Sequence, residues 1–261
     1  MKKISSALFI IVFILFTGAR AHAFVPQTPH LLDMVVKKIK RPMGLTCHQV
    51  RMEIIEDGTE EPLTSETLFY DFPEHLRTES DYPNPEDVQE RWVRIFSDIG
   101  FVKLKDGAVF SWNKALEDHE NDLLLYREPQ RMTQELEKVG IDISYGVFRR
   151  DEEGVIYYVV GRPGEDPSSY PSLWVEKDTL FPARYILEKD GKKMAFHYKN
   201  WQRFQRSWYP METLILVDDV PTARIRVENV KLKAGFPSAF FKLPRGLDPI
   251  APIVPVGNRG E

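Results

Sequence analysis

The sequence predicts a mainly β protein of the α+β class, in which a curved antiparallel sheet forms an incomplete β-barrel covered by helices. From Ile143 onward the chain reads as short apolar segments separated by tight turns, which is typical of an antiparallel meander. Only two segments of the chain show clear helical periodicity. Because such a sheet must close on itself or cover its apolar face, we expect the few helices to pack into its concave side.

The first 23 residues have the features of a cleaved export signal. Lys2 and Lys3 precede the apolar run from Leu8 to Phe16, and Ala21-His22-Ala23 supplies the small residues of a cleavage site. The apolar run is shorter than the roughly 20 residues that a membrane-spanning helix needs. We therefore expect residues 1–23 to be removed and the mature chain to begin at Phe24, with an uncleaved anchor as the alternative.

The length of the remaining chain suits one large β domain or two small ones. We expect one domain over residues 24–244, followed by a flexible tail over residues 245–261 that contains several Pro and Gly residues. Loss of the three cationic residues of the signal takes the net charge from −4 to −7. An acidic chain is a poor partner for nucleic acid, which rewards a basic face. The single cysteine, Cys47, excludes a disulfide within the chain, so the core must supply the stability.

Two helices are predicted. The first begins at Thr28-Pro29, presents Leu31, Leu32, Val35, Val36 and Ile39 at helical spacing, and ends before Pro42. The second covers Pro129 to Val139, with Gly140 as its C-terminal cap.

The first predicted strand alternates Val50, Met52 and Ile54 with Gln49, Arg51 and Glu53. Strands Ser65–Tyr70 and Leu76–Ser80 follow, joined by a corner at Asp71-Phe72-Pro73, and residues 84–100 fit either a helix or a strand. Further predicted strands are Phe101–Leu104, Ala108–Trp112, Ile143–Phe148, Val155–Val160, Leu173–Val175, Ala183–Glu188, Lys193–Trp201, Tyr209–Val217 and Thr222–Leu232.

The sequence contains no catalytic motif with specific spacing: neither a G-x-S-x-G nor an H-E-x-x-H, C-x-x-C, Walker or G-x-G-x-x-G pattern occurs. The acidic cluster Glu117, Asp118, His119, Glu120 and Asp122 fits no common metal site, and we interpret it as a solvated face. Cys47 and His48 are adjacent, so in a strand they point to opposite faces and cannot form a nucleophile–base pair. We therefore expect no catalytic residue, no metal site and no cofactor.

Several motifs resemble those of the periplasmic lipoprotein-carrier (LolA-like) superfamily, which includes proteins called outer-membrane lipoprotein-sorting proteins. The segment from Leu68 to Arg77 is similar to that family's strand, proline corner and arginine strand, and Leu173 to Arg184 is similar to its strand–turn–strand signature. The pattern continues through Phe196–Trp201, Trp208–Pro210, Val227–Val230 and Phe240–Pro244. The resemblance covers most of residues 30 to 244 and depends on the order of the motifs along the chain.

The resemblance implies an apolar cavity inside the incomplete barrel, lined by alternate side chains of the strands. The candidate lining residues are Val50, Met52, Leu68, Tyr70, Tyr158, Trp174, Tyr185, Leu187, Phe196, Tyr198, Leu214, Leu216, Ile225 and Val227. The alternative is that these residues form a closed, fully packed core. Arg77 resembles the family's arginine that latches the helical lid through hydrogen bonds; its alternative is a surface arginine on an edge strand.

The function implied is that of a monomeric periplasmic carrier for a lipid or for the acyl chains of a lipoprotein. Its partners would be an inner-membrane exporter and an outer-membrane acceptor. A second hypothesis is a regulatory or sensory module that detects lipids or lipoproteins in the envelope, although 238 residues are few for a two-domain regulator. A third, a hydrolase acting on an envelope component, depends only on scattered histidines and acidic residues.

Overall fold

The computed structural model describes residues 25–73, 75–81, 91–96, 101–103, 109–111, 119–162 and 167–242. The expected signal segment at 1–23 and the expected tail at 245–261 lie outside the described residues, as do Glu117 and Asp118. In the part of the chain described, no helix is long and apolar enough to cross a membrane.

The described residues form one antiparallel sheet with a small number of helices. The α-helices are α2 (Thr28–Ile39), α3 (Asp122–Leu125) and α4 (Pro129–Lys138), and the 3₁₀ helices are η1 (His119–Asn121), η2 (Pro167–Ser169) and η3 (Ser238–Phe241). The strands are β1 (Gly44–Ile54), β2 (Glu60–Asp71), β3 (His75–Asp81), β4 (Arg91–Phe96), β5 (Phe101–Lys103), β6 (Val109–Ser111), β7 (Gly146–Arg150), β8 (Ile156–Gly161), β9 (Ser172–Glu176), β10 (Pro182–Lys189), β11 (Lys192–Phe204), β12 (Ser207–Val217) and β13 (Val220–Lys233).

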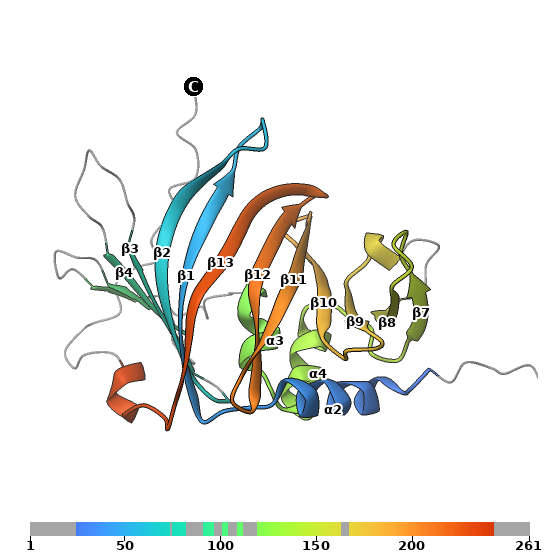
Figure 1. The fold of residues 1–261 in the computed structure, drawn as a ribbon, viewed down its shortest axis with the longest axis horizontal. Coiled ribbons are helices and arrows are strands. Elements are labelled where there is room, and N and C mark those ends of the chain that lie inside the picture. Colours follow the sequence, from blue (N-terminus) through green and yellow to red (C-terminus); the bar gives the residue numbers. More distant parts are fainter. Residues whose placement is uncertain are drawn as a thin grey trace, which may run out of the picture.

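The sheet consists of two arms that meet at its centre. Its strand order is β6-β5-β4-β3-β2-β1-β13-β12-β11-β10-β9-β8-β7, so the first and last strands of the chain pair with each other. The chain runs outward from β1 to β6, crosses through α3 and α4 to the other edge, and returns from β7 to β13. The edge strands β6 and β7 do not pair with each other, and Figure 1 shows a curved, open sheet. The predicted incomplete barrel is confirmed.

The helices pack against one face of this sheet because each presents an apolar side to it. In α2 the side chains of Leu31, Leu32, Val35 and Ile39 are buried, while Lys37 and Lys38 lie in its last turn, where cations favour the helix dipole. Figure 1 shows α2, α3 and α4 gathered near one end of the sheet, whereas β1, β2 and β13 extend well beyond them. The predicted bounds of both helices agree with the structure to within a residue or two, and Gly140 after α4 adopts a positive φ of 85° as expected of a C-terminal cap.

Two hydrophobic clusters lie between helices and sheet, and a third lies on the other face. The largest joins α2 and α4 to β8–β13, and the second joins α3 to β1, β2, β3, β12 and β13. The third cluster, on the opposite face of β8–β11, consists of Tyr157, Val159, Trp174, Ile186 and Ala195. The second arm of the sheet is therefore apolar on both faces.

The end of the described chain folds back onto the outer face of the first arm. Phe236 and Phe240 pack edge to face on Phe69 of β2, with ring centroids 5.9 and 5.0 Å away. Phe241 of η3 stacks on His75 of β3 at 5.3 Å. These aromatic contacts cover part of β2 and β3 on the side that faces away from the helices.

Candidate functional site

A pocket of about 250 Å³ opens on the concave face, on the side of the sheet that the helices cover. Its floor is apolar and consists of Met194, Phe196, Ile215, Val217 and Ala223 from β11, β12 and β13. Alternation along each strand places these side chains on one face. Its rim is polar and consists of Arg51, Arg94, His119, Glu120, Lys189 and Thr222.

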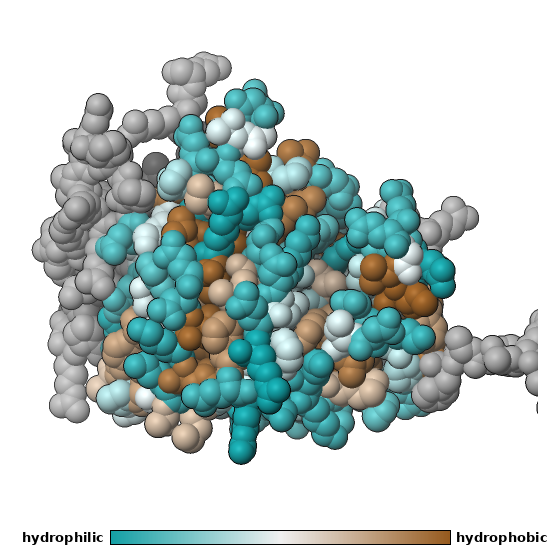
Figure 2. Space-filling view, in the orientation of Figure 1, coloured by the Kyte–Doolittle hydropathy of each residue, from teal (hydrophilic) through white to brown (hydrophobic). Residues whose placement is uncertain are grey.

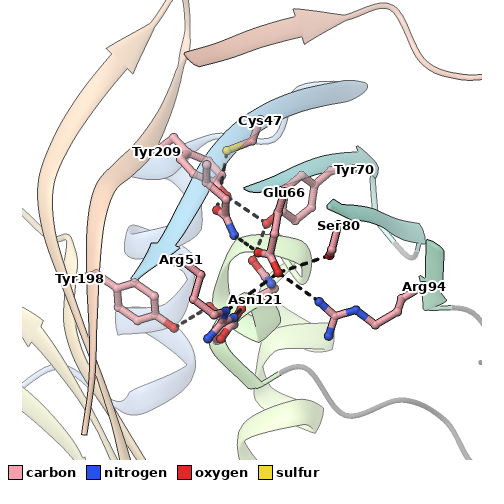
Figure 3. Close-up of polar contacts among 11 residues, drawn as sticks. Cys47, Arg51, Glu66, Tyr70, Ser80, Arg94, Asn121, Tyr198 and Tyr209 are labelled. Atoms are coloured by element: carbon pink, nitrogen blue, oxygen red, sulfur yellow. Dashed lines mark hydrogen bonds and ion pairs between the residues drawn. The ribbon is translucent and has the colours of Figure 1, made fainter. Parts of the chain in front are cut away.

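A buried carboxylate lies behind the rim. The side chain of Glu66 on β2 is 3% exposed and accepts hydrogen bonds from Gln49 Nε2 at 2.8 Å and Arg94 Nη2 at 3.2 Å. Arg51 Nε lies 3.9 Å from the same carboxylate. Figure 3 shows Arg51, Glu66 and Arg94 converging from β1, β2 and β4. The guanidinium groups of Arg51 and Arg94 therefore place positive charge beside a carboxylate that the sheet shields from water.

The segment η1–α3 is fastened to the sheet at the same place. Glu120 pairs with Arg51, and Tyr198 donates a hydrogen bond to the Glu120 carbonyl at 3.1 Å. Asp122 lies 3.0 Å from His119 Nδ1 and accepts a hydrogen bond from the Tyr185 hydroxyl at 3.1 Å. The helical connection between the two arms is thus held over the concave face by polar contacts at the rim of the pocket.

These contacts correct one interpretation of the sequence. The acidic cluster was expected to be a solvated face, but the side chains of Glu120 and Asp122 are only 12% and 14% exposed. Their partners, Arg51 and Tyr185, lie on strands remote in sequence, so no local pattern could reveal them. No group of three His, Cys, Asp or Glu side chains that could hold a metal ion occurs among the described residues.

A second polar cluster lies deeper, around two tyrosines. The hydroxyl of Tyr70 donates to Asn121 Oδ1 at 2.5 Å and lies 3.0 Å from the hydroxyl of Tyr209 (Figure 3). Burial raises the pKa of the nearby Cys47 thiol to about 12, and burial also raises the pKa of Tyr209. The thiol is therefore protonated and unreactive in the folded chain. These groups anchor α3 to the sheet and supply no activated nucleophile.

Arg127 joins the helices to the sheet and was not singled out from the sequence. Its guanidinium is fully buried and donates to the Leu124 carbonyl at 2.8 Å, and to the Lys40 carbonyl and Ser207 Oγ, both at 2.9 Å. It also lies 5.2 Å from the ring centroid of Phe72. Burial lowers its pKa to about 10, so it remains charged at neutral pH. The one signal in the sequence is a lone arginine directly after the apolar run 123–126.

The fourteen candidate lining residues divide between the two faces of the sheet. Phe196 lines the pocket, and eight more belong to, or pack against, the clusters beneath the helices: Leu68, Tyr70, Tyr158, Tyr185, Leu187, Tyr198, Ile225 and Val227. Most of the concave side is therefore filled by side chains of the protein, as the packed-core alternative expected. The space on the concave side that these side chains leave unfilled is the pocket of about 250 Å³ described above.

The other five candidates lie on the outer face, which corrects the prediction for them. Trp174 and Leu216 belong to or pack against the third cluster. Val50, Met52 and Leu214 pair across strands with Arg226 or Arg224, which bind Glu60 and Glu212 on the outer surface. Alternation shows which side chains share a face, but not which face becomes concave.

Arg77 does not latch the helices. It lies on the face of β3 opposite the buried Leu76 and Thr78. Its guanidinium donates to Glu79 and to the Phe240 carbonyl at 3.0 Å, and it lies 4.4 Å from the Phe240 ring centroid. It therefore ties the end of the described chain to the outer face. The latch expected of Arg77 is wrong, because alternation in β3 directs its side chain away from the helices.

A larger hollow of about 920 Å³ lies on the surface of the second arm. Trp174 and Tyr157 form part of its lining, and the Arg184 guanidinium lies over both rings at 5.0 and 5.5 Å from their centroids. Its charged lining residues are mixed in sign: Arg149, Arg150, Asp151, Glu152, Glu153, Glu176, Arg184 and Lys199. Figure 2 shows that the surface in the orientation of Figure 1 is mostly hydrophilic, with scattered hydrophobic side chains.

Comparison with solved structures identifies the fold. A putative outer membrane lipoprotein-sorting protein domain from Vibrio parahaemolyticus superposes with a TM-score of 0.53 at 10% identity, covering 82% of this chain and 95% of that one. A LolA superfamily protein from Nitrosomonas europaea gives 0.53 at 12% identity, covering 84% and 98%. A DUF1329 family protein from Desulfovibrio piger gives 0.52 at 14% identity, covering 84% and 97%. No sequence-family model and no curated protein sequence matches the chain.

The chain is thus an open antiparallel half-barrel whose concave face is covered by helices. More particularly, it has the fold of the LolA-like lipoprotein-sorting proteins, which confirms at the level of the fold the resemblance carried by the sequence motifs.

Proposed function

We propose that the chain is a monomeric periplasmic carrier, without enzymatic activity, that binds acyl chains of a lipid or lipoprotein on the concave face of the half-barrel. The observation that carries this proposal is the concave pocket, which has an apolar floor and a polar rim beside η1. The names of two proteins of the same fold, which refer to lipoprotein sorting and to the LolA superfamily, support it. An inner-membrane exporter and an outer-membrane acceptor are the partners proposed.

The chemistry of the cover fits a binding role. Each methylene removed from water contributes about 0.8 kcal/mol, so a carrier must offer an acyl chain an apolar surface equivalent to the bilayer. The existing pocket supplies part of this surface. The apolar contacts of α2 with the sheet would supply the rest if the helix moved, because an acyl chain can replace the side chains of Leu32 and Val35 against the same strands.

For the helical cover to open, two sets of polar contacts between the helices and the sheet must break. At one end Arg127 holds the C-terminus of α2 and the end of α3 to β12. At the other end the Arg51–Glu120 and Tyr198–Glu120 contacts hold η1 to β1 and β11. Both fastenings consist of hydrogen bonds and ion pairs, which exchange with water at low net cost and so allow a reversible cover.

The test is to purify the exported chain without detergent and to analyse an organic extract by mass spectrometry, followed by titration of the delipidated protein with a fluorescent fatty acid. We expect acyl lipids or lipopeptides in the extract and saturable uptake of the probe. Ala223→Trp places a large ring on the pocket floor and is expected to reduce uptake strongly. Val220→Trp, at a position 61% exposed on the same strand, is the matched control. No bound lipid and no uptake would contradict the proposal, and recovery of the chain outside the periplasmic fraction would contradict its location.

A further inference from the structure

We propose that the concave pocket selects single-chain amphiphiles with an anionic head, held through Arg94 and Arg51, with one alkyl chain lying across β13, β12 and β11. This inference deepens the proposed function by naming the class of ligand that the site takes. It depends on the arrangement of charge and apolar surface across the pocket.

The volume of the pocket limits how many alkyl chains of a ligand it can hold. Water occupies about 30 Å³ per molecule in the liquid, and a methylene group has a similar bulk, so about 250 Å³ holds roughly eight such groups. The structure as it stands thus accommodates part of one alkyl chain. Two or three chains side by side would exceed this space several-fold.

The order of the strands sets the direction of the ligand. Across the pocket, Arg94 lies on β4 and Arg51 on β1, while the apolar floor lies on β13, β12 and β11. The floor begins at the strand next to Arg51, and β11 lies three strand spacings from β1, or about 14 Å. A head at the two arginines therefore leaves its chain over Ala223, Ile215 and Phe196.

Cationic side chains at the pocket offer partners for an anionic head. Arg51, Arg94 and Lys189 line the pocket, whereas Glu120 and the buried Glu66 are the carboxylates that face the two arginines. His119 is paired with Asp122. Arg94 lies at a position partly shielded from water, where a charge-assisted hydrogen bond to an anionic head is strong.

The polar end of the pocket, around Arg94 and Arg51, also has hydrogen-bond donors that the described residues do not use. Arg94 uses one of its five N–H groups on Glu66, and its side chain is 32% exposed toward the pocket. Thr78 and Thr64 pair across strands with Arg94 and Arg51, respectively, and are nearly fully buried. Their hydroxyls have no hydrogen-bond partner within the described residues. A carboxylate or phosphate at the arginines would add acceptors to a region that has a surplus of donors.

The experiment measures displacement of a fluorescent fatty acid from the delipidated mature chain, with every competitor kept below its micelle concentration. Dodecanoate and dodecyl phosphate carry the anionic head, dodecyl maltoside is neutral, dodecylamine is cationic, and acetate and inorganic phosphate lack the chain. We expect both anionic amphiphiles to bind at least about tenfold more tightly than the neutral or cationic one, and the chainless anions to bind weakly.

Variants locate the head. Arg94→Gln is expected to abolish the preference for anionic heads while leaving the neutral competitor unchanged, and Arg94→Lys to retain part of it. Arg203→Gln, at an exposed arginine on β11, is the matched control. Circular dichroism checks that each variant is folded. If Arg94→Gln does not fold, a reduced preference in Arg94→Lys supports the placement of the head, and an undiminished preference in that variant contradicts it.

Any of the following results would overturn the inference that the pocket selects anionic single-chain amphiphiles. Equal binding of neutral and anionic amphiphiles would remove head selection but leave the acyl carrier standing, whereas binding of none would remove both. Inorganic phosphate binding as tightly as dodecyl phosphate would indicate an anion site without a chain. A preference that survives Arg94→Gln but disappears in Lys189→Gln would place the head at the opposite side of the pocket.

Discussion

Arg127 is held in the core by neutral groups rather than by a countercharge. Within the described residues it forms no ion pair, and its partners are two carbonyls and a serine hydroxyl. Each backbone carbonyl that loses such a donor in the interior costs about 1–3 kcal/mol. Arg127 therefore contributes to stability by donating hydrogen bonds to backbone carbonyls at the ends of α2 and α3 that have no partner within their own helices.

We predict that Arg127→Met lowers the free energy of unfolding by about 2–4 kcal/mol, because methionine keeps much of the volume but donates no hydrogen bond. Urea denaturation followed by circular dichroism measures the change. Arg203→Met, on an exposed arginine, is expected to shift it by less than about 0.5 kcal/mol. Equal midpoints for the two variants would show that Arg127 is not a structural fastening.

His197 on the outer face makes stability depend on pH. Burial, together with the nearby charges of Arg184 and Lys199, lowers its pKa from 6.5 to about 4. Between these two values the unfolded chain binds a proton at this position and the folded chain does not. The contribution is therefore fully present above pH 6.5 and is lost as the pH falls toward 4.

We predict that His197→Gln flattens the fall in unfolding free energy between pH 6.5 and 4, since the variant has no proton to bind there. Urea titrations at several pH values across this window give the slope for each protein. His30→Gln, at an exposed histidine on α2, serves as the control and should follow the parent chain. A slope unchanged by His197→Gln would contradict the assignment.

At the scale of elements, α2 is an amphipathic cover rather than an integral part of the sheet. Apart from Thr28 at its start, its buried residues are apolar, and its packing partners are α4 and the strands of the second arm. The polar attachments of its C-terminal end are those to Arg127 and Ser207, through the carbonyls of Ile39 and Lys40. In the proposed carrier, α2 would leave as a unit when an apolar ligand takes its place.

We predict that Leu32→Ala, at a side chain with no exposure in α2, lowers the unfolding free energy by about 2–4 kcal/mol. Lys37→Ala on the opposite side of the same helix removes only a surface ion pair with Asp33 and should cost about 0.5 kcal/mol or less. Denaturant titration compares the two. If Leu32→Ala were as mild as Lys37→Ala, α2 would contribute little to the fold.

At the scale of the molecule, the pairing of β1 with β13 makes the two arms a single sheet. The connection through α3 and α4 crosses the concave side from one edge to the other, so the same segment joins the arms in sequence and covers them in space. The pocket draws its lining from both arms and from this connection. A ligand bound there, as proposed, would contact both arms and the connection between them.

Much of this arrangement follows from local patterns. The helix at 28–39 is marked by Pro29 and by apolar spacing, and the second-arm strands are marked by alternation and turns, because both signals depend on neighbours in sequence. The order of motifs from Leu68 to Pro244 was enough to indicate the LolA-like fold that the structural comparison confirms. The sequence by itself thus determined the fold class, the positions of α2 and α4 and the succession of strands along the chain, whereas α3 and the pairing of β1 with β13 were not predicted.

Only the tertiary structure decided which side chains face the pocket. Continuous apolar runs such as Leu173–Val175 and Leu214–Leu216 are buried or half-buried on both faces, so alternation could not assign Trp174, Leu214 or Leu216. Arg51 and Glu66 point inward because they contact partners remote in sequence. For the same reason Arg127, and not Arg77, ties the helices to the sheet, while Arg77 binds the end of the described chain. A polar side chain becomes buried where distant groups satisfy it, and that condition exists only once the chain has folded.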